Sequence, residues 1–227
     1  MVSEFSATQS LRVAGFGCIR NGRVLLRQID FELHSSEILL LKGGNGTGKS
    51  TLLRSLAGLM AWRAGVLEWC GQTVLARHAD FQQQLAYLGH QCAMNDALSG
   101  LENLRFALGL QGVTWSAKGT LQVLEQLGVS DAARRPVGRL SQGQRRRIAI
   151  ARVMLSQRPL WLLDEPDNAL DADGSALIAG ILDAHAKAGG MSIVVSHRGL
   201  GVPQALQKTL DLSSVSPQQQ LVECIAC

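Results

Sequence analysis

The stretch Gly43-Gly44-Asn45-Gly46-Thr47-Gly48-Lys49-Ser50-Thr51 has two glycines that bracket four residues and are followed by Lys and Ser, the pattern of a phosphate-binding loop. Phosphate oxygens need several backbone N–H groups that point into one concavity, and glycine permits the conformations and the close approach that this requires. Lys49 adds a positive charge for the β- and γ-phosphates, and Ser50 offers a hydroxyl to Mg²⁺. Residues 37–42 read as a buried strand before the loop and residues 51–59 as a helix after it, so the stretch predicts a nucleotide-binding loop.

Length and composition fit one domain with a smaller lobe. The chain has 227 residues, 46% of them hydrophobic, which is enough to bury a sizeable core. No apolar run approaches the ~18 to 20 residues that cross a bilayer, and residues 1–6 lack the features of a signal peptide, so we expect a cytoplasmic chain. The net charge of +4 fits an anionic ligand, an anionic membrane surface or ordinary solvated side chains. Five cysteines at no repeating spacing are expected to be reduced: Cys18, Cys70, Cys92, Cys224 and Cys227.

The first part of the chain has the pattern of short strands. Residues 11–16 and 32–41 have strand-like apolar content, and Asn21-Gly22 predicts a hairpin turn between Ile19 and Val24-Leu25-Leu26. We therefore expect an antiparallel sheet at the N-terminal end. Residues 65–71 and 85–89 predict two more strands.

The middle of the chain is helical. Ser99 and Glu102 form a capping-box pattern that opens a helix through Leu110. A second helix is predicted over residues 117–127, which Gly128 can end. These helices predict a small lobe.

From Leu140 onward the pattern alternates between helices and strands. Ser141 is a plausible N-cap for a helix that stops at Arg158-Pro159, and residues 160–163 predict a buried parallel strand ending in Asp164-Glu165. Open α/β sheets bind their ligands at this end of their strands. A helix from about residue 175 to 187 and a strand over residues 193–195 complete a βαβ pattern.

Taken together, the motifs resemble those of the nucleotide-binding subunits of ABC transporters. They occur in this order: the phosphate loop, Leu140-Ser141-Gln142-Gly143-Gln144, Leu160 to Glu165, Ala169-Leu170-Asp171 and His197. A phosphate loop alone is shared with kinases and GTPases, but the Ser-Gln-Gly-Gln element is far more selective. The resemblance covers nearly the whole chain.

This resemblance implies an α/β fold of the P-loop NTPase type, with a mostly parallel core sheet, an N-terminal antiparallel β subdomain and a small helical lobe. It implies a single nucleotide-binding domain over residues 1–227, with the lobe at about 92–140 inserted in the ATP-binding core. Residues 203–227 are expected to form a C-terminal tail, polar enough from 213 to 220 to be a loop. The implied ligands are ATP and Mg²⁺, and the implied reaction is ATP hydrolysis.

Four residues have implied roles in the chain's own site. Asp164 would hold Mg²⁺ together with Ser50, as strand-end acids of phosphate-loop enzymes do. Glu165 would polarise the attacking water, and His197 would contact the γ-phosphate.

Other residues are implied to act on a second subunit. Ser141, Gln142, Gly143 and Gln144 open a helix whose N-terminus would close on the nucleotide of the opposite subunit. A complete site would need a head-to-tail homodimer, with Asp171 near the shared seam, and a membrane partner would convert closure and opening into work.

The sequence departs from the family pattern at two places. An aromatic residue usually stacks on adenine, but Arg20 stands nearest to that position, and either its guanidinium or Phe16 would have to serve. The glutamine that usually touches Mg²⁺ is replaced within Gly89-His90-Gln91, so either His90 or Gln91 would fill its place.

Within the family, several details are similar to the haem-exporter subunits of cytochrome c maturation. They are Cys18-Ile19-Arg20, Gly89-His90-Gln91, Arg145-Arg146-Arg147, Pro159 to Pro166, and His185 followed by Gly189-Gly190-Met191. This similarity implies an integral membrane permease of the CcmB type, other cytochrome c maturation membrane proteins, and a peripheral place on the cytoplasmic face of the inner membrane. ATP hydrolysis would power haem export or release of a haem-loaded chaperone.

Other functions remain open. The chain could serve another ABC exporter or act as a soluble ABC ATPase, but it has one phosphate loop and no long heptad run. A phosphate-loop kinase would leave the Ser-Gln-Gly-Gln element unexplained. Only 4% of residues are aromatic and no basic patch with interleaved aromatics occurs, so no nucleic-acid partner is expected. Cys224 and Cys227 read as an ordinary tail, not a metal site.

Overall fold

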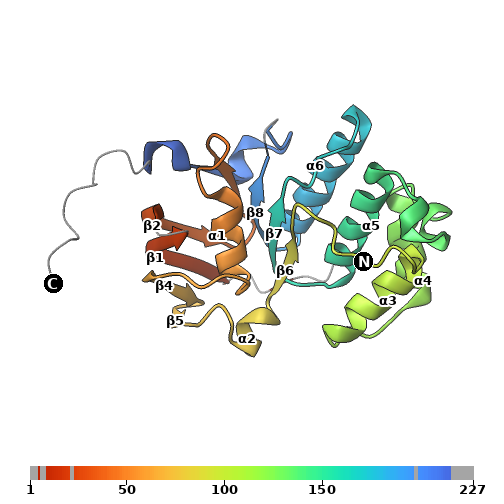
Figure 1. Cartoon of the computed structure of the whole chain (residues 1–227), viewed down its shortest axis with the longest axis horizontal. Helices are drawn as coiled ribbons and strands as arrows, with labels where there is room; N and C mark the ends of the chain where they lie inside the picture. Colours follow the sequence, from red (N-terminus) through yellow and green to blue (C-terminus); the bar gives the residue numbers. More distant parts are fainter. Residues whose placement is uncertain (1–4, 6–8, 21–22, 197–198, 216–227) are drawn as a thin grey trace, which may run out of the picture.

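The computed structural model describes residue 5 and residues 9–20, 23–196 and 199–215. An antiparallel sheet, a parallel sheet with helices on its faces and a helical lobe follow one another across the molecule (Figure 1). The predicted turn at Asn21-Gly22 lies outside the described residues, as do His197, Cys224 and Cys227. None of the helices in the described ranges is both long and apolar enough to cross a membrane.

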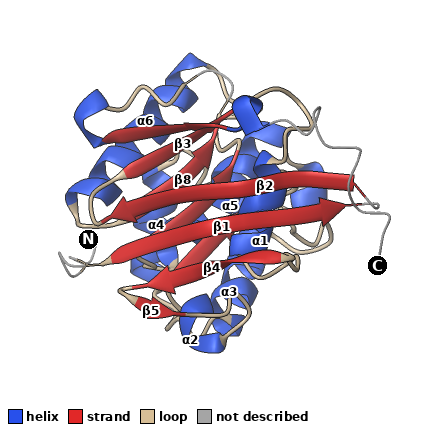
Figure 2. Ribbon diagram, turned by 90° about the vertical axis from the view of Figure 1, so that its left-hand side faces the viewer, coloured by secondary structure: helices blue, strands red, loops and turns tan. Residues whose placement is uncertain are grey.

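The antiparallel sheet runs in the order β2-β1-β4-β5 (Figure 2). Alternation along β1 buries Leu11 and Val13 and leaves Arg12 between them exposed, the pattern of a strand with one face against a core. Its strands are β1 (Ser10–Arg20), β2 (Arg23–His34), β4 (Ala64–Trp69) and β5 (Gln72–Thr73). The predicted N-terminal antiparallel sheet is therefore confirmed.

The prediction of strand content from residue 32 to 41 joined two strands into one. Strand β2 ends at His34, and a turn in which Ser36 adopts a φ of 70° separates it from the next strand. Residues 35 and 36 form a turn and pair with no strand. The chain leaves one sheet at this turn and enters the other.

The parallel sheet runs in the order β6-β7-β8-β3-β9 and places the ends of its strands next to one another. Strands β7 and β8 are buried at every residue, which is why they read as unbroken apolar runs. Its strands are β3 (Ile38–Lys42), β6 (Leu85–Leu88), β7 (Leu160–Asp164), β8 (Met191–Val195) and β9 (Gln207–Asp211).

Strand β9 was not predicted, because the residues from 203 onward have the pattern of a C-terminal tail. It pairs with β3 alone, at the edge of the sheet, and its residues are exposed or half-buried. An edge strand of this kind carries no apolar run that sequence reasoning can detect. Short 3₁₀ turns flank it: η3 (Gln204–Leu206) and η4 (Leu212–Val215).

Two of the four core helices, α5 and α6, begin directly after a residue whose side chain caps the helix. Helix α6 begins at Ala172, three residues before the predicted start, because the Asp171 carboxylate accepts a hydrogen bond from Gly174 N at 2.8 Å and caps it. The core helices are α1 (Lys49–Leu56), α2 (Ala79–Gln82), α5 (Gln142–Leu155) and α6 (Ala172–Lys187).

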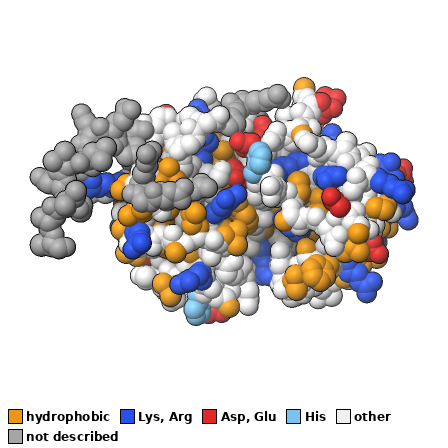
Figure 3. All heavy atoms as spheres, in the orientation of Figure 1, with side chains coloured by type: hydrophobic (Ala, Val, Ile, Leu, Met, Phe, Trp, Pro, Cys, Tyr) orange, Lys and Arg blue, Asp and Glu red, His pale blue; other side chains and the backbone are white. Residues whose placement is uncertain are grey.

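The helical lobe consists of α3 (Gly100–Leu110), α4 (Ala117–Gln126) and the 3₁₀ turns η1 (Ala132–Arg134) and η2 (Val137–Arg139). The predicted capping box of Ser99 and Glu102 is present at the start of α3. Hydrophobic side chains also gather on the surface of this lobe (Figure 3), where Phe106 is 66% exposed and Leu110 is 74% exposed.

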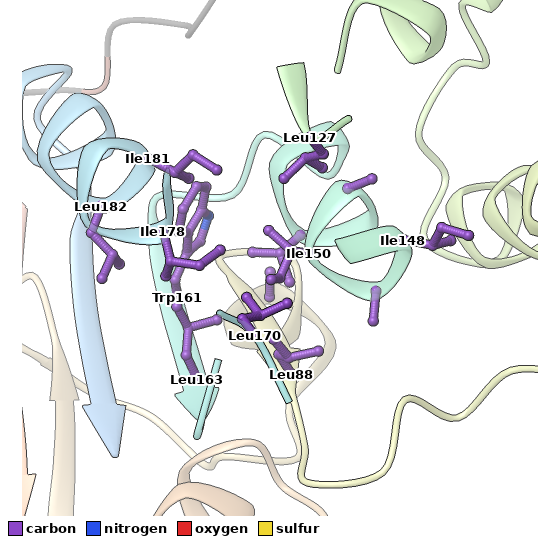
Figure 4. Packing of buried hydrophobic residues seen from close by; sticks show 14 of the residues in the cluster. Leu88, Leu127, Ile148, Ile150, Trp161, Leu163, Leu170, Ile178, Ile181 and Leu182 are labelled. Carbon is purple, nitrogen blue, oxygen red and sulfur yellow. The ribbon is translucent and has the colours of Figure 1, made fainter. Parts of the chain in front are cut away.

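One buried cluster joins the lobe to the core through α5. Ile148 and Leu127 lie on the side of the lobe, and Ile150 faces the sheet (Figure 4). On the other side of the same cluster, Trp161 of β7 lies beside Ile178 of α6 (Figure 4). Helix α5 therefore lies between the lobe and the sheet and fixes one relative to the other.

Candidate nucleotide-binding and catalytic site

The phosphate loop lies between β3 and α1, at the carboxyl end of the parallel sheet. Gly43 and Gly48 have φ values of 137° and 100°, which L side chains rarely adopt. A Cβ on Gly48 would also lie 2.9 Å from the side chain of Leu26, so the antiparallel sheet packs directly against the loop. The loop thus has the conformation that the sequence pattern requires.

Lys49 is 8% exposed and folds back over its own loop. Its Nζ donates hydrogen bonds to the carbonyl oxygens of Gly43 and Gly44, both at 2.8 Å. The ammonium group therefore lies beside the main chain that would surround a phosphate, and an anion there would meet a positive charge and the N-terminus of α1.

Ser50 and Asp164, which are far apart in sequence, are brought together by the end of β7. Ser50 Oγ donates a hydrogen bond to Asp164 Oδ1 at 3.1 Å. Asp164 Oδ2 is buried and has no hydrogen-bond partner among the described residues. Burial raises the pKa of Asp164 and the charge of Glu165 raises it further, while the hydrogen bond from Ser50 lowers it. A hydroxyl beside a buried carboxylate with one unsatisfied oxygen fits Mg²⁺, which prefers such ligands.

Glu165 follows Asp164 in a conformation that is unusual for a residue with a side chain. Its φ is 53°, and its N–H donates to the carbonyl oxygen of Val195 at 2.9 Å. Its Oε2 accepts a hydrogen bond from Asn168 Nδ2 at 3.3 Å and lies 3.5 Å from His90 Nδ1. The turn therefore directs the carboxylate toward the loop after β6.

Both candidates in that loop line a cavity of about 380 Å³, with Gln142 and Asn168 among its other residues. Of the two, His90 also lies next to the Glu165 carboxylate. The imidazole is therefore next to the acidic pair. Which of the two would contact Mg²⁺ stays a prediction.

The Ser-Gln-Gly-Gln element, Ser141 to Gln144, forms the N-cap and first turn of α5. Ser141 Oγ accepts a hydrogen bond from Gln144 N at 3.2 Å, and Gln144 Oε1 accepts one from Ser141 N at 3.1 Å, a reciprocal capping box. A Cβ on Gly143 would lie 3.0 Å from Ala169 O, so a larger residue would push this turn away from the loop that leads to Asp171.

Asp171 lies close to the same helix. Arg147 Nη2 of α5 is 3.6 Å from Asp171 Oδ1. Helix α5 and Asp171, the residue expected near the seam of a dimer, therefore lie on the same surface of the chain. The first turn of α5 is exposed at Ser141 and Gln142, which leaves it accessible to a second molecule.

Of the two alternatives for the adenine-stacking residue, Phe16 is excluded by its burial. Phe16 is 1% exposed and packs edge-on against Trp62, with ring centroids 5.3 Å apart, inside the antiparallel sheet. Its side of β1 faces the core, so the ring is not available to a base. Arg20 ends β1, but its side chain lies outside the described part of the chain.

Sequence reasoning missed two residues that contact the site. Asn168 binds the Glu165 carboxylate, and Arg146 donates to main-chain carbonyl oxygens of the loops that carry His90 and Glu165. The sequence showed Arg146 only as part of a triplet of arginines. In the fold Arg146 is only 4% exposed, and no local sequence pattern indicates this burial.

Comparisons with known proteins agree with this geometry. The family model "ABC transporter" matches residues 26–168. The chain is 41% identical over 208 residues to the Cytochrome c biogenesis ATP-binding export protein CcmA of Bordetella bronchiseptica. The aligned residues cover 91% of this chain and 92% of that protein. It is 44% identical over 204 residues to the protein of the same name from Cupriavidus necator, covering 90% and 89%.

Solved structures share the fold. A putative ABC transporter ATP-binding protein from Pyrococcus furiosus superimposes with a TM-score of 0.79 at 22% identity, covering 91% of this chain and 99% of that one.

Proposed function

The chain belongs to the ABC transporter family of ATP-binding proteins, in the branch of the CcmA cytochrome c biogenesis ATP-binding export proteins, and we propose that it hydrolyses ATP to power an export or release step in c-type cytochrome biogenesis. The observation that carries the ATPase chemistry is the hydrogen bond between Ser50 and Asp164, with Glu165 next to them. The assignment to cytochrome c biogenesis rests on the named relatives.

The phosphate loop would bind the phosphates of ATP. Its main-chain N–H groups and Lys49 face the negative charge, and the dipole of α1 adds to the attraction. Ser50 and Asp164 would hold Mg²⁺, which neutralises charge on the β- and γ-phosphates when bound. Both residues can do this with modest movement because they already contact one another.

Glu165 would act on the attacking water. Its carboxylate accepts a proton or orients water through a hydrogen bond, and the surrounding contacts to Asn168 and His90 fix its direction. His90 would assist as a charge partner of Glu165 or as a ligand for Mg²⁺, and Gln91 is the alternative ligand. His197 is proposed to contact the γ-phosphate on the basis of the motif order alone.

A complete site is proposed to form between two copies of the chain. The exposed first turn of α5, from Ser141 to Gln144, would close on the ATP of the partner subunit, and Asp171 would lie at the shared seam. A head-to-tail homodimer satisfies this requirement twice. Hydrolysis would then release the two copies from each other.

An integral membrane permease of the CcmB type is the proposed partner that uses this motion, with other cytochrome c maturation membrane proteins. The exposed Phe106 and Leu110 on the helical lobe support contact with another protein. This arrangement would place the chain peripherally on the cytoplasmic face of the inner membrane. The alternative is that the chain is the ATPase subunit of another ABC exporter.

The cellular test is haem staining of membrane c-type cytochromes in cells that lack this chain. We expect holocytochromes to vanish and to return with the wild-type chain but not with Glu165→Gln. If holocytochromes persist without the chain, the cytochrome c assignment fails and another exporter becomes the better proposal. ATP hydrolysis by the purified chain is measured separately, so that failure of the ATPase assignment is distinguishable.

A further inference from the structure

Arg146 in α5 is a buried arginine, although this residue type is seldom buried in proteins. Its guanidinium donates to main-chain carbonyl oxygens on two loops, one after β6 and one after β7. On the first loop Nη1 donates to Gly89 at 2.8 Å and to His90 at 3.5 Å. At the end of β7 Nη2 donates to Asp164, and on the loop that follows it donates to Glu165 at 2.6 Å while Nε donates to Pro166 at 3.4 Å.

The two loops that Arg146 joins carry the candidate catalytic side chains. His90 belongs to the first and Glu165 to the second, and their side chains lie 3.5 Å apart. A guanidinium is planar and holds its donors in a fixed fork, so the carbonyl groups that bind it are held at a fixed separation. Arg146 therefore sets the distance between the main chains on both sides of this contact.

Glu165 depends on such support because of its backbone. A φ of 53° in a residue with a side chain persists only where surrounding hydrogen bonds determine it. The Glu165 N–H donates to Val195 O, and the Glu165 carbonyl oxygen accepts hydrogen bonds from Arg146 and from Asn168 N. Without the bond from Arg146, only the turn bond from Asn168 N, at 3.0 Å, holds the Glu165 carbonyl oxygen, and the link from this peptide to the loop that carries His90 is lost.

We propose that Arg146 is a positioning residue for ATP hydrolysis, which holds Glu165 and His90 in their catalytic geometry through the main chain and does not touch the nucleotide. The proposal rests on the ATPase function proposed above and adds a residue to it. The neighbouring arginines bind elsewhere: Arg145 Nη1 donates to Asp96 at 3.2 Å, and Arg147 Nη1 donates to Leu127 O at 3.0 Å. The role therefore belongs to the middle residue of the triplet.

The test compares Arg146→Gln and Arg146→Lys with Arg158→Gln in the purified full chain. Arg158 is a matched control because it also donates to main-chain carbonyl oxygens, those of Gln83 and Gln111, but away from the site. The measurements are kcat and KM for ATP, the Kd for a fluorescent ATP analogue, the thermal midpoint, and size-exclusion chromatography with ATP.

We expect Arg146→Gln to lower kcat about 100-fold and Arg146→Lys about tenfold, with Kd within about twofold of the wild type, because positioning of a general base acts on the chemical step. We also expect Arg146→Gln with ATP to accumulate as a dimer, since binding persists while cleavage is slow. A residue that only stabilises the fold would lower dimer formation instead. Arg158→Gln should keep the wild-type kcat.

The proposal is overturned if Arg146→Gln keeps the wild-type kcat. It is also overturned if this variant loses catalytic rate, ATP affinity and dimer formation together. If Arg146→Gln does not fold, Arg146→Lys decides on the same criteria. An inactive wild-type chain instead refutes the proposed function, and the two failures are thereby separate.

Discussion

The imidazole Nδ1 of His90 lies 3.5 Å from the carboxylate Oε2 of Glu165, and the two residues come from loops at the ends of neighbouring parallel strands. The contact joins His90, whose role the sequence left open between two residues, to Glu165, whose role in polarising water the family resemblance implied directly. It also shows where the carboxylate can act: it faces the loop after β6, on the same edge of the sheet as Asp164 and the phosphate loop.

Glu165→Gln should abolish turnover and retain ATP. The amide keeps the size of the carboxylate but cannot take a proton, and loss of a general base lowers the rate at least about 100-fold. Size-exclusion chromatography with ATP should show a trapped dimer. Glu125→Gln, an exposed acid on α4, is the control and should keep the wild-type rate. Unchanged hydrolysis in Glu165→Gln would refute the role of this residue.

Lys49→Ala should weaken nucleotide binding. A charge-assisted hydrogen bond contributes about 1.5 to 3 kcal/mol, so the Kd for ATP should rise at least about tenfold. Equilibrium binding of a fluorescent ATP analogue checks this, with Lys118→Ala on the helical lobe as the control. Normal ATP affinity in Lys49→Ala would contradict the assignment of the loop.

Asp164 should make thermal stability depend on Mg²⁺. Burial raises its pKa, so the folded state binds the proton more tightly than the unfolded state does, and ionisation at neutral pH costs stability. That cost is absent at acid pH and appears as pH rises through the raised pKa. At pH 7.5 without Mg²⁺, Asp164→Asn should therefore raise the thermal midpoint above that of the wild type.

Mg²⁺ with ATP should raise the wild-type midpoint far more than that of Asp164→Asn, because only the wild type retains the charged ligand. Asp131→Asn removes an exposed carboxylate and should change neither behaviour. An Asp164→Asn variant that responds to Mg²⁺ like the wild type would remove this residue from the site.

His185 should make the fold sensitive to mild acid. Burial lowers its pKa from 6.5 to about 4, and its ring stacks on Trp161 with centroids 3.7 Å apart. Between pH 6.5 and 4 the unfolded chain takes up a proton that the folded chain does not, so stability falls by up to roughly 3 kcal/mol across that range. Urea unfolding at pH 7 and pH 5 measures the loss.

His185→Leu should lose less stability than the wild type between those two pH values, whatever its stability at pH 7. His78 is exposed, and His78→Gln should lose as much as the wild type does. Equal losses in all three chains would show that His185 does not control the acid response.

Base selectivity should be weak. Phe16 is buried and cannot stack on a base. The residue nearest to the position of the usual adenine-stacking aromatic is Arg20. A guanidinium stacks on any base with similar strength. In competition, GTP should displace a fluorescent ATP analogue at a concentration within about tenfold of ATP itself. Strong preference for ATP would mean that another residue recognises adenine.

Local patterns explain most of what the sequence predicted correctly. The glycine spacing of the phosphate loop, the capping box at Ser99 and the N-cap at Ser141 are contained within a few residues. Buried strands such as β7 were visible as apolar runs. For these elements the residues that determine the structure are also adjacent in the chain.

Features that depend on distant segments were missed. Arg146 binds carbonyl oxygens from two remote loops, and main-chain carbonyl groups leave no trace in a sequence. The sequence offered His90 and Gln91 as alternative contacts for Mg²⁺, and the position of His90 beside Glu165 depends on the path of a loop. The start of α6 was placed too late because Asp171 was considered as a seam residue and not as an N-cap.

The pairing of β3 on both sides has a consequence for how the chain is made. Strand β3 leads directly into the phosphate loop, yet both of its neighbours, β8 and β9, come from the far end of the sequence, with Ile38 opposite Ser192 and Gln207. Parallel pairing between such distant segments is intrinsically slow to form. During synthesis on the ribosome, the strand below the nucleotide site must therefore wait for almost the entire chain before its sheet can close.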